Sequence, residues 1–339
     1  MHRIVKSFRD NFVEGRFVIP LTSLFVVGMR IMLYLKRGFP IIKSSTSNFI
    51  WTPIAPFFEK PLISLFASTL LVFVISWIFF FINNRYSIIR SRTNLPFVTS
   101  LFLLSLHPYC LVMTGDYIAI VFILLAFIPL LDSYQMPNSY LYSFRSSILI
   151  GVASLFQVFA LIFIPLWWRG ERSMRGPQLR SVVASIFGVL LVYISLFSVY
   201  FVFDDIYGFL LPFSNFATIS LPVIPDYSIF EWIAFLLVVF FFIINLIISI
   251  KEYSRDKVLT VSLMQFIVYL IIILLLLQIL YWQETLFYLI LSATLISFVC
   301  SYFYSKTTVK TDIFLAYTML FLIILFYLSQ YFPETYLKT

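Results

Sequence analysis

A few ionisable side chains lie inside or beside long apolar stretches of this 339-residue chain, and these could carry chemistry. Arg30 falls within an apolar run, where its guanidinium could extend to the membrane interface or hold a phosphate through two parallel hydrogen bonds. His107 and Asp116 could form an acid–base pair with Glu59 nearby, which makes these three the candidate catalytic residues. His-Pro and Gly-Asp pairs also end and begin helices, so a purely structural role for His107 and Asp116 stays open.

Other charged residues fall in gaps expected on the same side of a membrane. If the chain binds a lipid-linked phosphate, the cations expected to contact it are Arg30, Lys60 and Lys43. The remaining acids on that side are Asp204, Asp205 and Asp226. The two histidines and two cysteines show no metal-ligand spacing, so no metal site is predicted. A divalent cation is expected only if one of the acids is catalytic.

The composition restricts the class of protein. Hydrophobic residues make up 62% and charged residues 11% of the chain, and apolar stretches recur to its end, which indicates an integral membrane protein. The net charge of +8 would suggest a nucleic-acid partner in a soluble protein, but the cations gather beside the apolar stretches, where anionic lipid explains them. Membrane lipid is therefore the expected partner and nucleic acid is not. Any chemistry must occur at a membrane face, because the longest polar gaps are short.

Apolar runs of membrane-spanning length predict an all-α polytopic fold with about ten or eleven transmembrane helices. The runs are 17–35, 61–83, 95–113, 116–132, 145–168, 180–203, 229–250, 258–281, 285–303 and 313–332. The leader and the gap after the second run are rich in arginine and lysine, so both are expected in the cytoplasm.

Alternation through ten spans places the basic loop 169–180 outside, against the positive-inside bias. Splitting 145–168 into two half-crossings, about 145–156 and 158–168, that meet near Gln157 returns this loop to the cytoplasm. A break there requires protein or water to satisfy the backbone polar groups, since lipid cannot. Eleven crossings then place the N-terminus in the cytoplasm and the C-terminus outside. The alternative is one continuous helix with the basic loop outside.

Two outer gaps, 36–60 and 204–228, are too apolar for free loops and too rich in proline for spans. The first is expected to lie along the interface, with the amphipathic segment 48–58 in the headgroup layer. Together the two gaps could cover a cavity on this face, or they could pack on the rim of the bundle.

The order of these parts is similar to that of a known superfamily. The long first helix, the outer interfacial loop, the hairpin with Asp116 near its tip and the small-residue segment 151–157 followed by Pro165 and a basic loop resemble the GT-C superfamily over about residues 17–203. That resemblance implies a polytopic glycosyltransferase that uses a polyprenyl-phosphate sugar. The chain also looks like a multi-pass membrane family of Bacteroidota, in the segments 83–86, 90–96, 107–108 and 131–135, and that resemblance implies no activity.

The chain departs from the GT-C pattern in two places. Such enzymes usually carry an Asp or Glu soon after the first helix, whereas this chain has Lys36, Arg37 and Lys43 there, and Glu59 only at the far end of the loop. Relatives also often have a lysine where Gln157 stands. Whether the chain is an enzyme is left open by these differences.

Three functions remain open from the sequence. The first is a GT-C-like transferase at the outer face of the bacterial inner membrane, active in assembly of envelope glycans, with a membrane module over 1–203 and further helices over 204–339. The second is a non-catalytic scaffold or lipid-binding subunit of an envelope complex. The third is a transporter or flippase, although the two halves show no repeat.

Overall fold

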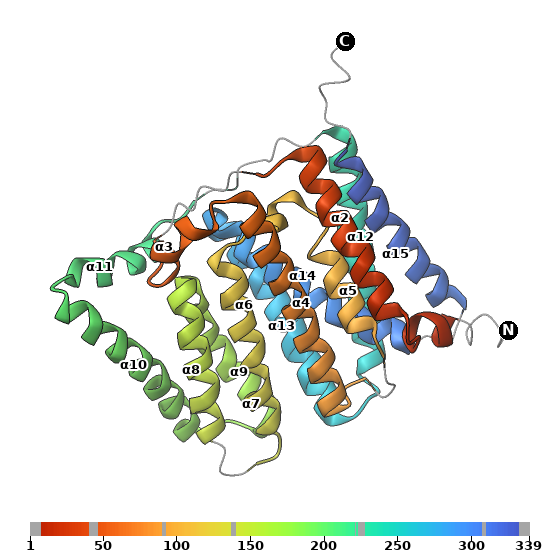
Figure 1. Ribbon diagram of the computed structural model, residues 1–339. Coiled ribbons are helices and arrows are strands. Elements are labelled where there is room, and N and C mark those ends of the chain that lie inside the picture. The colour runs from red at the N-terminus through yellow and green to blue at the C-terminus, as the bar shows by residue number, and fades with distance from the viewer. Residues whose placement is uncertain are drawn as a thin grey trace.

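The computed structural model describes residues 8–40, 47–89, 93–136, 140–220, 222, 228–306 and 310–331, and these form helices joined by short connections (Figure 1). Eight helical segments in this part of the chain are long and apolar enough to cross a membrane. Six of them are single helices: α2 (Val18–Arg37), α4 (Pro61–Tyr86), α10 (Leu179–Val202), α12 (Ile229–Tyr253), α13 (Val258–Leu280) and α15 (Lys310–Ser329). The other two are each made of two consecutive helices. Segment Gly115–Asp132 comprises α6 (Gly115–Leu125) and α7 (Phe127–Asp132), and segment Trp282–Ser305 comprises η6 (Trp282–Glu284) and α14 (Thr285–Ser305). The predicted all-helical fold, with several helices long and apolar enough to cross a membrane, is confirmed for the described residues.

Local sequence signals begin and end several of these helices. Pro61 begins α4 at a position where its missing N–H is not needed, and Ser228 and Glu231 form a capping box at the start of α12. Helix α2 ends at Gly38, whose positive φ of 74° is accessible to glycine without strain.

The apolar run 95–113 does not form one spanning helix. Helix α5 (Leu95–Leu103) ends after nine residues, and a single turn, η3 (Pro108–Leu111), follows it. Pro108 disfavours helical geometry at the residue before it, and His107 is extended, with φ −113° and ψ 142°. The run therefore enters the bundle as a short helix and continues across it as an irregular segment.

The run 145–168 is interrupted at Gln157. Helix α8 (Tyr140–Phe156) ends before it, Gln157 has an extended backbone with φ −146° and ψ 105°, and η4 (Val158–Ile162) and α9 (Phe163–Arg175) follow. A hydrogen bond from Arg175 to the Ser143 hydroxyl joins the end of α9 to the start of α8, so the chain turns back on itself. The interruption predicted at Gln157 is present, and the alternative of one continuous helix is wrong.

Protein groups satisfy the backbone at this interruption. The Ile50 N–H donates to the Leu155 carbonyl at 2.9 Å, and the Val158 N–H donates to Asn48 Oδ1 at 3.0 Å. The segment that precedes α3 (Trp51–Ile54) therefore supplies the partners that lipid could not. Residues 47–58, which include α3 and η2 (Ala55–Phe58), lie over the interruption at one end of the bundle (Figure 1).

The two ends of the bundle differ in charge. Arg85 pairs with Asp132 at 3.2 Å, and Lys306 pairs with Asp256, at the end we call the basic end. The described cations at this end include Arg9, Arg16, Arg85, Arg169, Arg172, Arg175, Arg180, Lys251, Arg255, Lys257, Lys306 and Lys310. The opposite end, which we call the acidic end, carries Glu59, Asp204, Asp205, Glu231 and Glu284 together with fewer described cations, which are Lys36, Arg37 and Lys60. Helix α2 runs from the basic end to the acidic end, where the chain also leaves α15 (Figure 1).

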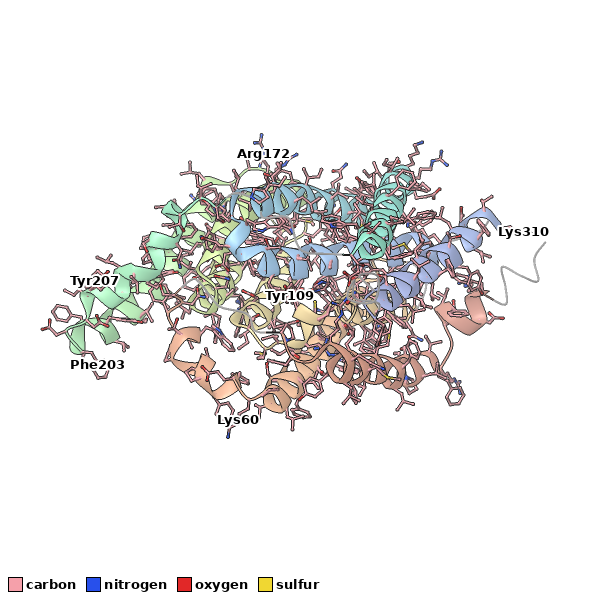
Figure 2. The ribbon with its side chains drawn as sticks, turned by 90° about the horizontal axis from the view of Figure 1, so that it is seen from above. Lys60, Tyr109, Arg172, Phe203, Tyr207 and Lys310 are labelled. Atoms are coloured by element: carbon pink, nitrogen blue, oxygen red, sulfur yellow. The ribbon has the colours of Figure 1, made fainter. Side chains whose placement is uncertain are left out.

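A buried centre and an apolar periphery follow from the packing. Helix α14 is almost wholly enclosed, with Tyr288, Leu291 and Phe298 at most 1% exposed, whereas Phe187 and Ile194 on α10 are both 61% exposed. Helix α10 diverges from the centre and leads to α11 (Ile206–Leu210) and η5 (Leu211–Ala217), so that Phe203 and Tyr207 lie at the edge of the molecule (Figure 2). Large exposed apolar faces of this kind are suited to contact with lipid.

Candidate functional site

Three buried polar side chains meet at the helix interruption. Gln157 Nε2 donates to Asp116 Oδ1 at 2.7 Å and to Glu284 Oε2 at 2.6 Å. Asp116 and Glu284 are each 7% exposed and Gln157 is 2% exposed. The amide of Gln157 thus joins the two carboxylates, although Gln157 and Glu284 are 127 positions apart in the chain. We call Asp116 and Glu284 the acid pair.

Each member of the acid pair stands at the start of a helix. Asp116 lies in the first turn of α6, where the Thr114 hydroxyl donates to its Oδ2 at 2.9 Å, and Glu284 directly precedes α14. The partial positive charge at a helix N-terminus stabilises a carboxylate there. Gln157 can reach both because α8 ends beside them and its backbone turns away.

Close packing encloses the group. A Cβ added at Gly115 would lie 2.6 Å from the Phe156 carbonyl oxygen and 2.8 Å from Trp51 Cγ, so only glycine allows this approach. The indole of Trp51 is buried and stacks on Phe58 with 5.5 Å between ring centroids. Helix α3 and η2 therefore cover the acid pair on the side of the acidic end.

Two polar atoms beside the acid pair have no hydrogen-bond partner among the described residues. They are Gln157 Oε1 and the hydroxyl of Tyr288, which follows Glu284 by one turn of α14. An unpaired buried polar atom costs about 1–3 kcal/mol, and a water molecule or an ion held beside it removes that cost. Two acids within reach of one amide favour uptake of a proton or a cation, because like charges in a water-poor interior repel each other.

The exposed acids do not join this site. Glu59 and Asp204 are exposed, and exposed Asp205 caps α11 by accepting the Gly208 N–H at 2.8 Å. Lys60, also exposed, precedes α4 at the edge of the bundle (Figure 2). Lys43 and Asp226 lie outside the described residues.

His107 lies in a pocket of about 210 Å³ at the acidic end, together with Arg37, Glu231 and Gln330. Arg37 pairs with Glu231, and burial together with the Arg37 charge lowers the pKa of His107 to about 4. His107 is neutral at pH 7, and its Nδ1 accepts the Tyr109 N–H at 3.3 Å. His107 therefore lies in this pocket, whereas Asp116 contacts Gln157 in the buried acid pair.

Arg30 is 1% exposed, and each of its nitrogen atoms donates to the protein. Its acceptors are Thr69 Oγ1 at 2.9 Å, Ser68 Oγ at 2.7 Å, Ser105 Oγ at 3.4 Å and the carbonyls of Leu104 at 3.2 Å and Cys110 at 2.8 Å. Five acceptors match the five N–H donors of a guanidinium. In this arrangement Arg30 ties α2 to α4 and to the irregular segment after α5.

Sequence reasoning placed Asp116 in the site but missed Glu284 and Tyr288. Glu284 stands in a three-residue gap between the runs 258–281 and 285–303, which has the appearance of an ordinary loop. Its burial and its approach to Asp116 depend on packing between distant helices. No group of three or more His, Cys, Asp or Glu side chains that could hold a metal occurs among the described residues.

Comparisons with protein-family models, with curated proteins and with solved structures give no match to this chain.

Proposed function

We propose that this protein is a membrane glycosyltransferase of the GT-C type, which takes a sugar from a polyprenyl-phosphate carrier and uses Asp116 and Glu284 as its catalytic acids. The observation that carries the proposal is the acid pair itself, buried at a helix interruption and bridged by Gln157. One acid of such a pair can be ionised and take the acceptor's proton while the other stays protonated.

The depth of the acid pair favours chemistry at a membrane face over transport through the membrane. Asp116 is the second residue of the span Gly115–Asp132, and Glu284 is the third of the span Trp282–Ser305. Both therefore stand within the first turn from the acidic end. Transporter sites formed at broken helices usually lie near the middle of the bilayer.

The proposed orientation follows from charge. The basic end faces the cytoplasm of a bacterial inner membrane, because lysine and arginine are retained on that side. The acidic end, where α15 ends, then faces outward, toward lipid-linked sugars and envelope acceptors. In this proposal α3 lies in the outer interface. It admits the substrate by a movement that takes Trp51 out of its buried position.

The enzyme also needs to hold the phosphate of its donor. The pocket that contains Arg37 and His107 opens at the same end, and Arg37 is 31% exposed although it pairs with Glu231. A guanidinium suits phosphate oxygens geometrically. Lys60 and Lys43 remain proposed contacts to lipid phosphate from the interfacial loop.

Single amide variants test this proposal. Membranes from a strain that lacks the protein receive wild-type or variant protein and radiolabelled polyprenyl-phosphate sugar, and transfer of label to lipid-free product is measured. We expect Asp116→Asn and Glu284→Gln to lower the transfer rate by about 10²–10⁴, the usual contribution of general acid–base catalysis. Glu252→Gln, at an exposed acid of α12 near the basic end, is the matched control. Amides of Glu59, Asp204 and Asp205 in the same series test the exposed acids.

A non-catalytic scaffold or lipid-binding subunit is the second candidate, and the enclosure of the acid pair favours it, since neither acid is open to an acceptor in this structure. In that case all the amide variants, at normal abundance, support the same envelope phenotype as the wild type. The transferase proposal would then have to be abandoned.

A further inference from the structure

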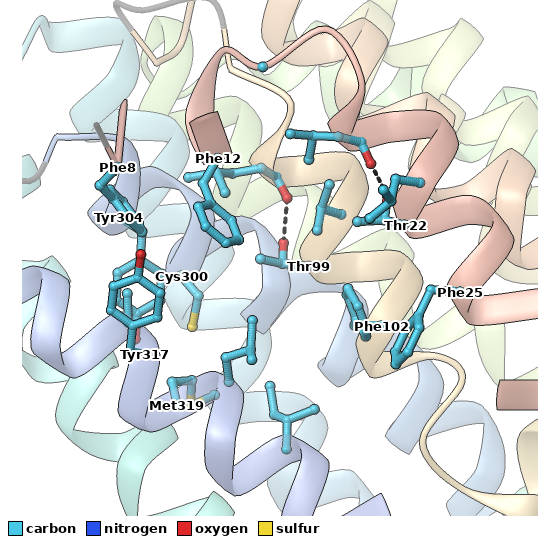
Figure 3. A pocket seen from close by; sticks show the side chains of 18 of the residues that line it. Phe8, Phe12, Thr22, Phe25, Thr99, Phe102, Cys300, Tyr304, Tyr317 and Met319 are labelled. Carbon is cyan, nitrogen blue, oxygen red and sulfur yellow. Dashed lines mark hydrogen bonds between the residues drawn. The ribbon is translucent and has the colours of Figure 1, made fainter. Parts of the chain in front are cut away.

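A large apolar cavity lies at the other end of the protein from the acid pair. It has a volume of about 810 Å³ and lies between α2, α5 and α15, with η1 (Arg9–Val13) at its entrance. Phe8, Phe12, Phe25 and Phe102 are among the side chains that surround it (Figure 3). Cavities of about 300–1,000 Å³ commonly hold ligands of drug or cofactor size.

The deep part of the cavity offers nothing to a polar ligand. The Thr22 hydroxyl donates to the Val18 carbonyl at 2.6 Å, and the Thr99 hydroxyl lies 2.8 Å from the Leu95 carbonyl (Figure 3). The Thr99 hydroxyl also contacts α14, at the Ser297 carbonyl and the Ser301 hydroxyl. Each threonine therefore presents mainly its methyl group to the cavity. From Phe17 to Phe25 the wall follows α2 for roughly 12 Å, at 1.5 Å per residue, from the basic end into the apolar layer.

The entrance carries one acid and one base. Asp10 and Arg16 both line it, both are exposed, and neither has an ion pair or a side-chain hydrogen bond to another described residue. Arg9, by contrast, pairs with Glu14 at 2.8 Å and does not line the cavity. A carboxylate and a guanidinium, with no side-chain partner among the described residues, thus share the rim of this apolar cavity.

We propose that this cavity binds a phospholipid whose headgroup contains a primary amine, drawn from the leaflet at the basic end. An acyl chain fills the cavity, Arg16 contacts the phosphate, and Asp10 contacts the ammonium group. Charge complementarity selects this occupant: a headgroup with no ammonium leaves Asp10 unpaired, and a quaternary ammonium cannot donate hydrogen bonds to it. The site is separate from the acid pair and stands whether or not the protein is a transferase.

Native mass spectrometry of delipidated protein tests the proposal, with dioleoyl phosphatidylethanolamine, phosphatidylcholine and phosphatidylglycerol titrated separately. We expect the ethanolamine lipid to bind most tightly. Arg16→Gln should weaken all three lipids by about fivefold, since one cation near the membrane surface contributes on the order of 1 kcal/mol. Asp10→Asn should weaken only the ethanolamine lipid, and Arg9→Gln should change none of them.

A variant that fills the cavity tests the position of the acyl chain. Ala316 of α15 lines the cavity and is small, so Ala316→Phe should abolish the bound lipid, whereas Ala184→Phe, at a comparably exposed position of α10, should not. Equal affinity for the ethanolamine and choline lipids in wild type would overturn the headgroup assignment. Normal lipid binding by a folded Ala316→Phe protein would place the lipid elsewhere. A uniform effect of Asp10→Asn on all three lipids would contradict the contact between Asp10 and the ammonium group. The headgroup variants are at exposed positions and remain informative if Ala316→Phe fails to fold.

Discussion

Replacement of Gln157 separates the contributions of its amide from those of the helix break. Gln157→Leu removes two hydrogen bonds to carboxylates, at 2.7 and 2.6 Å, each with a net contribution of about 1.5–3 kcal/mol. It also removes the unpaired Oε1, which increases the free energy of unfolding by about 1–3 kcal/mol. The difference predicts a loss of roughly 2–3 kcal/mol. Gln157→Lys instead places an ammonium between the two acids, so it should be tolerated better than leucine.

Thermal unfolding in detergent, followed by size-exclusion chromatography of heated samples, measures this difference. At about 2 °C per kcal/mol for a protein larger than 150 residues, Gln157→Leu should lower the midpoint by roughly 4–6 °C. Gln278→Leu is the matched control, because Gln278 is partly buried in α13 and has no hydrogen bond to the described residues. A Gln157→Leu protein as stable as wild type, or a lysine variant less stable than the leucine variant, would refute the stabilising role of the Gln157 amide between the two acids.

Three further outcomes follow from the structure. Single cysteines at exposed Ser87 and Ser214, which lie at the basic and acidic ends, should differ in whole cells, with only position 214 labelled by an impermeant thiol reagent; labelling of 87 alone would invert the proposed orientation. Gly115→Ala should cost about 1–3 kcal/mol in thermal unfolding, because its Cβ would meet backbone at 2.6 Å, whereas Gly28→Ala, with open space, should be neutral or stabilising. The pKa of His107 is lowered to about 4 in the folded protein, so its contribution to stability is complete above about pH 6.5 and is lost as the pH falls toward 4. His107→Gln should flatten that part of the pH profile of the unfolding midpoint. An unchanged profile would contradict the lowered pKa.

The helical spans and the break at Gln157 could be predicted because both depend on local composition. A helix needs about 20 apolar residues to cross the bilayer, and the arginines of the 169–180 loop could be reconciled with the cytoplasmic side only by an interruption upstream. Short elements were harder to predict. The run 95–113 has the composition of a span, and only the His107–Pro108 step signals that its helix ends early.

The site was predicted only in part because its pairing is not local. Asp116 was recognisable as an acid at a helix start, but its partner Glu284 comes from a helix near the other end of the chain. Arg30 shows the same limitation in reverse. An arginine in an apolar run suggests an external phosphate, whereas here the donors meet hydroxyls and carbonyls from α4 and the segment after α5. Sequence spacing does not show which buried polar groups meet across helices.

A double-mutant cycle on the transfer rate tests the central claim most directly. Asp116→Asn, Glu284→Gln and the combined variant are assayed with the labelled polyprenyl-phosphate sugar at equal abundance in the membrane. Residues that act as one catalytic unit are strongly non-additive, so the combined variant should be no slower than the slower single variant, with both singles slowed by about 10² or more. Wild-type transfer by the combined variant would contradict the assignment of the acid pair as the catalytic site.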